Sequence, residues 1–326
     1  MTPEAFKMPA LLELLKDGAF HSGEKLGEAL GISRAAVWKQ LQQLESQLGL
    51  TIHKVPGKGY CLSQRISLLD PSAIDERFLG LQRIYLSETL DSTNAEALRL
   101  ISQRKPLPFL VLSEQQTSGR GRRGRTWVSP FGANLYYSLA IQLVQGAQQL
   151  EGLSLVIGLA VLRTIEEAGV TNAGLKWPND ILVGHKKMAG ILLELVGDPA
   201  DICHVVIGVG INVNMLSSKD EIDRPWTSLL CETGILQDRS QLASRLNHHI
   251  SHYLGRHRLN GFTTLMDEWR AADLWMGREV RLSSGVGEVA GTSLGIDERG
   301  GLRLLVGGAE QVFCGGELSL RLRDDS

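Results

Sequence analysis

The sequence predicts a multidomain α+β protein with an N-terminal winged helix-turn-helix, a central mixed α/β domain and a small C-terminal SH3-like β-barrel. Three observations support this prediction. Apolar residues recur at helical spacing before residue 50, apolar strands alternate with helices in the middle, and short strands separated by glycine turns follow Met276. The expected domains are residues 1–66, 67–273 and 274–326.

Composition limits the class of protein. The 326 residues hold 34 lysines and arginines against 36 aspartates and glutamates, so DNA binding would need a local basic patch. The longest apolar run, residues 153–162, has roughly half the length that a bilayer span needs, which argues against a membrane protein. Its four cysteines lack C-x-x-C spacing, which suits reduced thiols in the cytoplasm.

Three short amphipathic helices are expected before residue 50. Ser22 is a plausible N-cap for the second helix, Gly31 is placed to end it, and Ser33 can cap the third. A helix, a turn and a second helix form a helix-turn-helix, whose second member enters the major groove of DNA. The residues expected to face DNA are Ser33, Arg34, Ala36, Lys39 and Gln40. The periodicity places Trp38 near the inner face.

Residues 51–62 predict two short strands around the turn Pro56-Gly57-Lys58-Gly59. A hairpin after a helix-turn-helix makes a wing, whose Lys54 and Lys58 would meet the phosphate backbone. A docking module without a DNA role fits the same pattern. Residues 64–71 are expected to form the linker.

The central block is expected to begin with a capped helix and to continue as strands around long helices. Thr93 and Glu96 fit the S/T-x-x-E capping box, so a plain helix cap is the alternative to a ligand site at Asp91-Ser92-Thr93-Asn94. The strands are expected at residues 109–113, 134–143, 175–177, 181–183, 187–195 and 204–213, and the helices at 153–168 and 240–254.

A glycine–arginine segment, Gly119–Ser129, follows the first of these strands. It places four guanidinium groups, those of Arg120, Arg122, Arg123 and Arg125, between glycines. Such forks suit carboxylate or phosphate oxygens. Because four like charges cannot bury one another, we expect the segment to be mobile without ligand and to order around a polyanion.

Other interpretations of this segment are weaker. Gly119-x-Gly121-x-x-Gly124 spells the dinucleotide fingerprint, but residues 126–130, Thr-Trp-Val-Ser-Pro, break a helix, and no acidic residue follows at the expected spacing. No Gly-Lys-Ser/Thr follows, which excludes a P-loop. A solvated basic loop remains an alternative.

Two further features are ambiguous when taken alone. Lys187 lies beside the hairpin turn 184–186, where a lysine is usually solvated and inert. His248 and His252 have zinc-site spacing on a helix, but no glutamate lies between them and no third ligand is signposted, so a solvated helix face is favoured.

The order of the motifs identifies a family. The motifs are Asp91-Ser92-Thr93-Asn94, Gln116 with the glycine–arginine segment, Lys176-Trp177-Pro178-Asn179-Asp180, Lys187-Met188-Ala189-Gly190 and Gly208-Val209-Gly210-Ile211-Asn212-Val213-Asn214. Together they resemble the biotin protein ligases, specifically the bifunctional bacterial type that also represses the biotin operon. The resemblance covers essentially the whole chain and implies a biotin/lipoate-ligase-like catalytic domain.

The resemblance implies a role for each matching residue. Biotin contacts fall to Ser92, Thr93, Asn94, Gln116, Arg120, Gly121, Arg122 and Lys187, of which Lys187, Arg122 and Arg120 would serve catalysis. Contacts to ATP or the adenylate fall to Trp127, Lys176, Asn179, Asn212 and Arg321, and Asp180 would be the carboxylate linked to Mg²⁺.

The implied activity is ATP-dependent formation of biotinyl-5'-AMP and transfer of biotin to a lysine of the biotin carboxyl carrier protein of acetyl-CoA carboxylase. The implied partners also include operator DNA, bound by a homodimer that forms when biotinyl-AMP is present. A repressor that senses a small anion without catalysis, and a lipoate-type ligase, remain alternatives.

Overall fold

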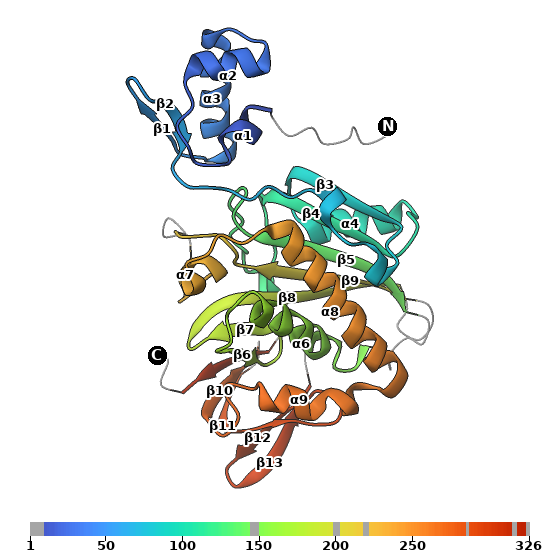
Figure 1. Cartoon of the computed structure of the whole chain (residues 1–326). Coiled ribbons are helices and arrows are strands. Elements are labelled where there is room, and N and C mark those ends of the chain that lie inside the picture. The colour runs from blue at the N-terminus through green and yellow to red at the C-terminus, as the bar shows by residue number, and fades with distance from the viewer. Residues whose placement is uncertain are drawn as a thin grey trace.

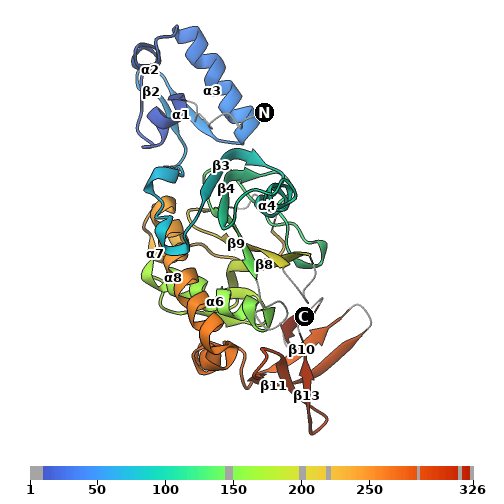
Figure 2. The ribbon, with the colours of Figure 1, turned by 90° about the vertical axis from the view of Figure 1, so that its right-hand side faces the viewer.

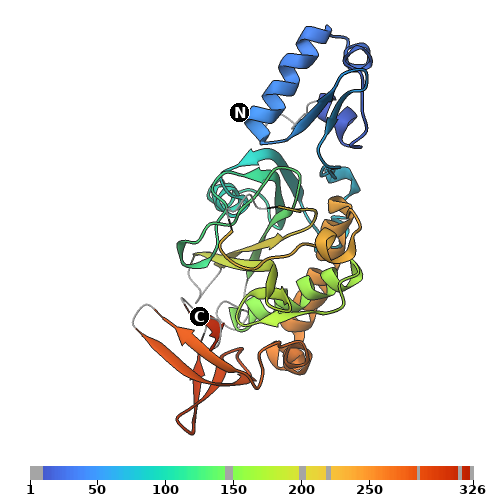
Figure 3. The same ribbon diagram turned by 90° about the vertical axis from the view of Figure 1, so that its left-hand side faces the viewer.

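The computed structural model describes residues 10–143, 150–197, 203–217, 222–284, 287–314 and 318–323. A winged N-terminal module and a C-terminal sheet lie at opposite ends of a central sheet (Figures 1 and 3). No helix within the described ranges is long and apolar enough to cross a membrane.

The N-terminal module is a winged helix-turn-helix. Its elements are α1 (Ala10–Leu15), α2 (Gly23–Leu30), α3 (Arg34–Leu48), β1 (Ile52–Val55) and β2 (Gly59–Leu62). The capping predictions are confirmed: Ser22 Oγ accepts from the Lys25 amide at 3.1 Å and Ser33 Oγ from the Ala36 amide at 3.2 Å. Gly31 ends α2 with a φ of 65°, a left-handed conformation that favours glycine.

Helix α3 corrects one expectation. Its buried stripe is Val37, Leu41, Leu44 and Leu48, the three- and four-residue spacing of a helix face. Trp38 is one residue from this stripe, about 100° around the helix, and its side chain is 47% exposed. The prediction that Trp38 lies near the inner face is therefore wrong.

The central sheet has seven strands in the order β3-β4-β5-β9-β8-β7-β6. Their bounds are β3 (Arg83–Leu90), β4 (Phe109–Gln116), β5 (Leu135–Leu143), β6 (Ala173–Lys176), β7 (Asp180–Val183), β8 (Lys186–Gly197) and β9 (Cys203–Ile211). Among these described strands, β3 and β4 pair in parallel and the other neighbours are antiparallel. The edge strand β3 is the strand that the sequence analysis missed.

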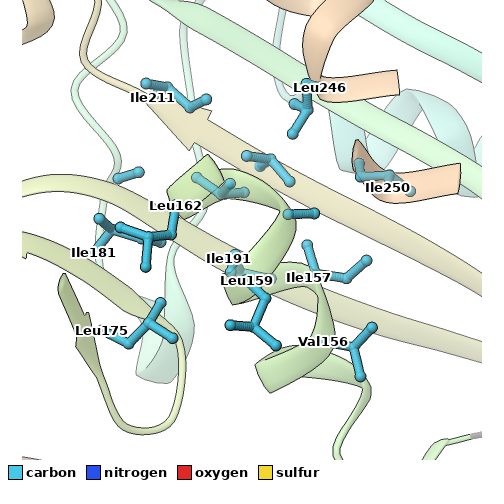
Figure 4. Close-up of a cluster of buried hydrophobic side chains, with 14 of the residues drawn as sticks. Val156, Ile157, Leu159, Leu162, Leu175, Ile181, Ile191, Ile211, Leu246 and Ile250 are labelled. Atoms are coloured by element: carbon cyan, nitrogen blue, oxygen red, sulfur yellow. The ribbon is translucent and has the colours of Figure 1, made fainter. Parts of the chain in front are cut away.

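Helices cover the two faces of this sheet unequally. Helices α6 (Leu153–Glu167) and α8 (Arg239–Asn260) form the main core with one face, as the side chains in Figure 4 show. Helix α4 (Thr93–Ser102) packs on the opposite face (Figure 2). The other helical turns within the described ranges are α7 (Leu229–Thr233), α9 (Met266–Ala271), η1 (Pro71–Ala73), η2 (Arg77–Leu79), η3 (Arg122–Gly124) and η4 (Phe262–Leu265).

The C-terminal domain is an antiparallel sheet of five strands in the order β13-β12-β11-β10-β14. They are β10 (Glu279–Ser283), β11 (Glu288–Ile296), β12 (Leu302–Val306), β13 (Ala309–Phe313) and β14 (Ser319–Leu322), and all follow Met276 as predicted. Across the described residues, the edge strands β13 and β14 do not pair with each other. The strands are confirmed, but a closed SH3-like barrel is not.

A buried ion pair fastens the linker to the central domain. Glu114 on β4 and Arg239 at the start of α8 pair with both side chains fully buried. Arg239 Nε donates to the Ser67 carbonyl at 2.6 Å, and the Leu69 amide donates to Glu114 Oε1 at 2.6 Å. Arg239 Nη1 also donates to the Asn134 carbonyl at 2.9 Å. The linker thus supplies partners that a buried charge pair requires.

Candidate ligand-binding site

One cavity of about 530 Å³ lies on the α4 face of the central sheet. Every ligand-site residue predicted from the sequence lines it: Ser92, Thr93, Asn94, Gln116, Arg120, Gly121, Arg122, Trp127, Lys176, Asn179, Asp180, Lys187, Asn212 and Arg321. These residues are up to 229 positions apart (321 − 92) in the chain. The fold therefore brings the five motifs into one site.

Glycines of β8 and β9 leave the floor of the cavity bare. Gly190 pairs with Gly210, and a Cβ on Gly210 would lie 2.6 Å from the Trp127 ring. One step along, a Cβ on Gly208 would lie 2.3 Å from Asn94 Oδ1. Because side chains would collide there, the glycines let Trp127 and Asn94 rest directly on the sheet.

The end of the cavity beside α4 is neutral and polar. Gln116 Oε1 accepts from the Thr93 amide at 2.8 Å, and the Ser138 hydroxyl lies 2.8 Å from Thr93 Oγ1 and 2.6 Å from Asn94 Oδ1. Thr93, Asn94 and Ser138 are all buried. Such a cluster of donors and acceptors suits a neutral head group with its own donors and acceptors.

The capping-box prediction for this helix is wrong. Ser92, not Thr93, is the N-cap, and its Oγ accepts from the Ala95 amide at 3.5 Å. Glu96 instead pairs with Arg99 at 2.7 Å. The Thr93 hydroxyl is therefore directed to Gln116 and Ser138, inside the site.

Two arginines of the glycine–arginine segment have partners outside the segment even without ligand. Arg120 Nη1 lies 2.8 Å from Glu194 Oε1. Arg122 donates to Asn179 Oδ1 at 2.9 Å and to the Leu318 carbonyl at 3.1 Å. Instead of the helix that a dinucleotide turn opens, the segment forms the single turn η3, in which Arg123 has a φ of 60°. The segment therefore bridges the central sheet and the C-terminal domain.

A β-bulge directs Lys187 into the cavity. The partners of β7 pass from Ala189 opposite Ile181 to Lys187 opposite Leu182, so Met188 is an extra residue on β8. The extra residue changes the alternation of side chains and puts Lys187 on the same face as Gly190. Lys187 Nζ lies 2.6 Å from Asp180 Oδ1 and 5.3 Å from the centroid of the Trp127 ring.

Positive charge dominates the end near β6 and β7. Burial by itself would raise the pKa of Asp180, but the ammonium groups of Lys187 and Lys176 outweigh it and hold this pKa below its usual value. Burial lowers the pKa of Lys176 to about 8, although Asp180 opposes the shift. Its ammonium lies 4.4 Å from the centroid of the Trp275 ring. Burial, and then the nearby Arg224, lower the pKa of Arg125.

Eight cationic side chains and two carboxylates, Asp180 and Asp223, line the described part of the cavity. The cations are Arg120, Arg122, Arg123, Arg125, Lys176, Lys187, Arg224 and Arg321. Arg224, with Pro225 and Trp226 beside it, was not found from the sequence, because these residues lie in an irregular segment without a motif. Their place is set by backbone pairing with β8, where the Lys187 amide donates to the Pro225 carbonyl at 2.9 Å.

Asn212 lines the cavity and also holds its wall together. Its Nδ2 donates to the Thr227 carbonyl at 3.0 Å and to the Lys187 carbonyl at 3.3 Å. Both hydrogen bonds of the Asn212 side-chain nitrogen therefore go to backbone carbonyls of the cavity wall.

The predicted DNA-facing residues lie on α3 and on the β1–β2 hairpin. Ser33, Arg34, Lys39, Lys54 and Lys58 are exposed, whereas Ala36 and Gln40 are half-buried. Lys58 lies 5.9 Å from the centroid of the Phe20 ring, and Lys54 lies 6.0 Å from that of Tyr60.

Comparison with known proteins identifies the family. Residues 86–212 match the Biotin/lipoate A/B protein ligase family, and residues 9–61 match the HTH domain. The Bifunctional ligase/repressor BirA of Salmonella typhimurium is 42% identical over 312 residues, which cover 95% of this chain and 96% of the relative. The corresponding protein of Escherichia coli is 40% identical over 311 residues, with the same coverage of both chains.

The chain belongs to the BirA family of bifunctional ligase/repressors. It is a biotin protein ligase that carries an N-terminal helix-turn-helix domain.

Relatives without the bifunctional name match a shorter part of this BirA-family chain. The Biotin--[acetyl-CoA-carboxylase] ligase of Mycobacterium tuberculosis is 37% identical and covers 77% of this chain and 95% of its own. The biotin protein ligase from Aquifex aeolicus in complex with biotin and ATP is 31% identical with a TM-score of 0.66, and covers 74% of this chain and 100% of its own.

Proposed function

We propose that this chain joins biotin to ATP, forming biotinyl-5'-AMP, and then transfers the biotinyl group to a lysine of the biotin carboxyl carrier protein of acetyl-CoA carboxylase. The single observation that supports this most is the polarity of the cavity. A neutral, hydrogen-bonding end beside α4 continues into an end lined mainly by cations. That order suits an acid whose neutral head enters first and whose carboxylate meets a polyphosphate.

In the first step, a carboxylate oxygen of biotin attacks the α-phosphorus of ATP, and the bond to the β-phosphate oxygen breaks as pyrophosphate leaves. Two anions must approach each other. Cations around them reduce this repulsion and stabilise the charge that develops on phosphorus. We assign this role to Arg120, Arg122 and Lys187. The Lys187 ammonium lies beside Asp180 in the cationic end of the cavity, where the carboxylate of biotin would meet ATP.

Biotin itself is assigned to the neutral end. Ser92, Thr93, Asn94 and Gln116 would contact its head, and Gly121 leaves room for the glycine–arginine segment to approach. Thr93 and Asn94 are buried and fixed by hydrogen bonds, so the site is preorganised for one orientation of the head.

The nucleotide is assigned to the cationic end, with Trp127, Lys176, Asn179, Asn212 and Arg321. Trp127 Nε1 is buried and, among the residues described, has no hydrogen-bond acceptor. An unpaired buried donor is costly, so Trp127 is suited to donate to a bound nucleotide. Arg321, on β14, would bring the C-terminal domain into the same site.

Magnesium does not fit this site as a resident ion. The described residues hold no group of three acidic, histidine or cysteine side chains, and Asp180 is already paired with Lys187. Mg²⁺ prefers about six oxygen ligands and commonly arrives with substrate phosphates. We therefore propose Mg²⁺ as a companion of ATP, with Asp180 nearby.

In the second step, the lysine amine of the carrier attacks the acyl carbon of biotinyl-5'-AMP, and AMP leaves with the electrons of the broken carbon–oxygen bond. The mixed anhydride hydrolyses if water reaches it. We propose that the glycine–arginine segment covers the adenylate until the carrier docks, since its arginines already contact both sides of the cavity.

We further propose that the chain is a cytoplasmic repressor of biotin synthesis. Residues 1–66 would bind operator DNA through Ser33, Arg34, Ala36, Lys39 and Gln40 on α3 and through Lys54 and Lys58 on the wing. Residues 67–273 would catalyse, and residues 274–326, completing an SH3-like fold, would close the site. Biotinyl-AMP would promote a homodimer that presents two winged modules to a two-fold operator.

Incubation with ATP, labelled biotin or labelled lipoate, and a carrier domain tests the ligase function. Label on the carrier from biotin alone supports the proposal. Label from lipoate alone would make the chain a lipoate-type ligase, and binding without transfer of either acid would leave a sensor.

A further inference from the structure

Glu194 on β8 joins two site residues that belong to different elements. Its Oε1 lies 2.8 Å from Arg120 Nη1 in the glycine–arginine segment, and its Oε2 accepts from Asn94 Nδ2 on α4 at 2.7 Å. The reaction proposed above gives this carboxylate no part. A carboxylate beside a site for two anions would by itself weaken their binding. The contacts of Glu194 therefore need an explanation.

The alternation of β8 places Glu194 just beyond the residues of this strand that form the cavity floor. Gly190, Leu192 and Glu194 are two residues apart and share a face of the sheet, opposite Gly210, Gly208 and Val206 of β9. The cations Lys176 and Lys187 line the other end. Beside α4 the floor therefore ends at a carboxylate that is paired with Arg120, whereas cations in excess of carboxylates lie beside β6 and β7.

Glu194 fixes which way the Asn94 amide points. Asn94 Nδ2 donates to Glu194 and, at 3.3 Å, to the Leu192 carbonyl. Asn94 Oδ1 accepts from the Ser138 hydroxyl at 2.6 Å. A carboxylate only accepts and therefore holds the amide in this orientation, with its oxygen beside Ser138.

Glu194 also anchors Arg120 across the neutral end. An isolated ion pair of this exposure, 42% for Arg120 and 23% for Glu194, contributes little by itself. Here, however, Asn94 and the sheet already hold the carboxylate, so less side-chain entropy is lost when Arg120 pairs with it. An isolated antiparallel β-bridge also pairs the backbone of Arg120 with that of Thr126, within the glycine–arginine segment.

We propose that Glu194 is a positioning residue for the acid substrate, which orients Asn94 and holds Arg120 beside the head of the acid. This inference rests on the proposed ligase function and adds the orientation of the acid within it. Substrates are then acids with one anionic end and an uncharged, hydrogen-bonding head.

The test is steady-state kinetics of biotin-dependent ATP–pyrophosphate exchange for wild type, Glu194→Ala and Glu194→Gln. Glu194→Ala is expected to raise KM for biotin about tenfold, equivalent to one lost hydrogen bond to a charged group. KM for ATP should stay within about twofold, because the nucleotide lies at the other end. A fall in kcat is also expected, because Arg120, which loses its partner, is assigned to the reacting groups. Glu194→Gln keeps an acceptor for Asn94 but no charge for Arg120, so its KM for biotin should lie between the two.

Glu96→Ala is the matched control, because Glu96 pairs at 2.7 Å with Arg99, which does not line the cavity, whereas both partners of Glu194 do. A merely structural role of Glu194 would lower kcat and thermal stability without a selective change in KM for biotin. If wild type is active and both Glu194 variants keep its KM for biotin within twofold, the inference is overturned. If wild type itself makes no adenylate from biotin, the proposed function fails first.

Discussion

Removal of one partner from the buried pair between Glu114 and Arg239 should destabilise the chain strongly. Both side chains are fully buried, and Arg239 donates to three elements: the linker at Ser67, the carbonyl of Asn134 and the carboxylate of Glu114. Arg239→Met would leave a buried carboxylate without its counter-charge, for which we expect a loss of about 3–5 kcal/mol. Domains of this kind are stable by only about 5–15 kcal/mol.

The double variant Glu114→Gln/Arg239→Met separates charge from packing. The Glu114→Gln change removes the anion that Arg239→Met alone would leave unpaired. The new side-chain amide oxygen can still accept from the Leu69 amide, which in the native chain donates to Glu114 at 2.6 Å. We therefore expect the double variant to be more stable than Arg239→Met by about 2 kcal/mol, a coupling typical of residues in one network.

Hydrogen exchange at the Leu69 amide is the appropriate assay, because a chain with several domains need not unfold in one step. A loss of about 3 kcal/mol corresponds to roughly hundredfold faster exchange. Arg77→Met is the matched control, since Arg77 pairs with Asp75 while its own side chain is 88% exposed, and it should leave the Leu69 amide unchanged. Exchange of Arg239→Met within threefold of wild type would refute the reasoning.

Four further predictions concern the site and the domain boundary. Arg122→Gly should raise release of the adenylate into solution about tenfold, measured by labelling of added albumin, and unchanged release would count against a covering segment. Lys187→Ala should slow adenylate synthesis about a hundredfold in a single turnover, and a normal rate would remove Lys187 from the reaction. KM for ATP should rise as the pH passes about 8, because Lys176, beside Asp180 and three other cations, then loses its charge, whereas Lys176→Met should have a high KM at every pH. Burial raises the pKa of Asp273 to about 6, so the folded state binds more protons than the unfolded state between about pH 4 and 6, and stability should fall as the pH rises through that window. Asp273→Asn should remove this dependence in urea unfolding curves measured across the window.

Local signals in the sequence were sufficient for the winged module and for the contents of the site. Caps such as Ser22, Ser33 and Gly31 act within three residues, so their pattern can be read directly. The motifs that line the cavity could be assigned to one site because their order along the chain resembles that of one family. The prediction for Trp38 failed because the period of α3 does not by itself say where the buried stripe is centred.

Long-range features could not be predicted in the same way. Glu114 and Arg239 are 125 residues apart, and Glu194 meets Arg120 across 74 residues, so nothing local indicates either pairing. The bulge at Met188 depends on the register of β7 against β8, yet it decides that Lys187 faces the cavity. In the part of the chain that the structure describes, the edge strand β3 pairs with β4 alone, and its mostly half-buried residues lack a clear alternation.

A crystal structure of the chain with biotin and ATP would test the central claim most directly. The account predicts biotinyl-5'-AMP with its head beside Asn94 and its phosphate beside Lys187, and the glycine–arginine segment closed over both. A structure with the nucleotide bound elsewhere, or with that segment turned to solvent while the adenylate is present, would contradict it.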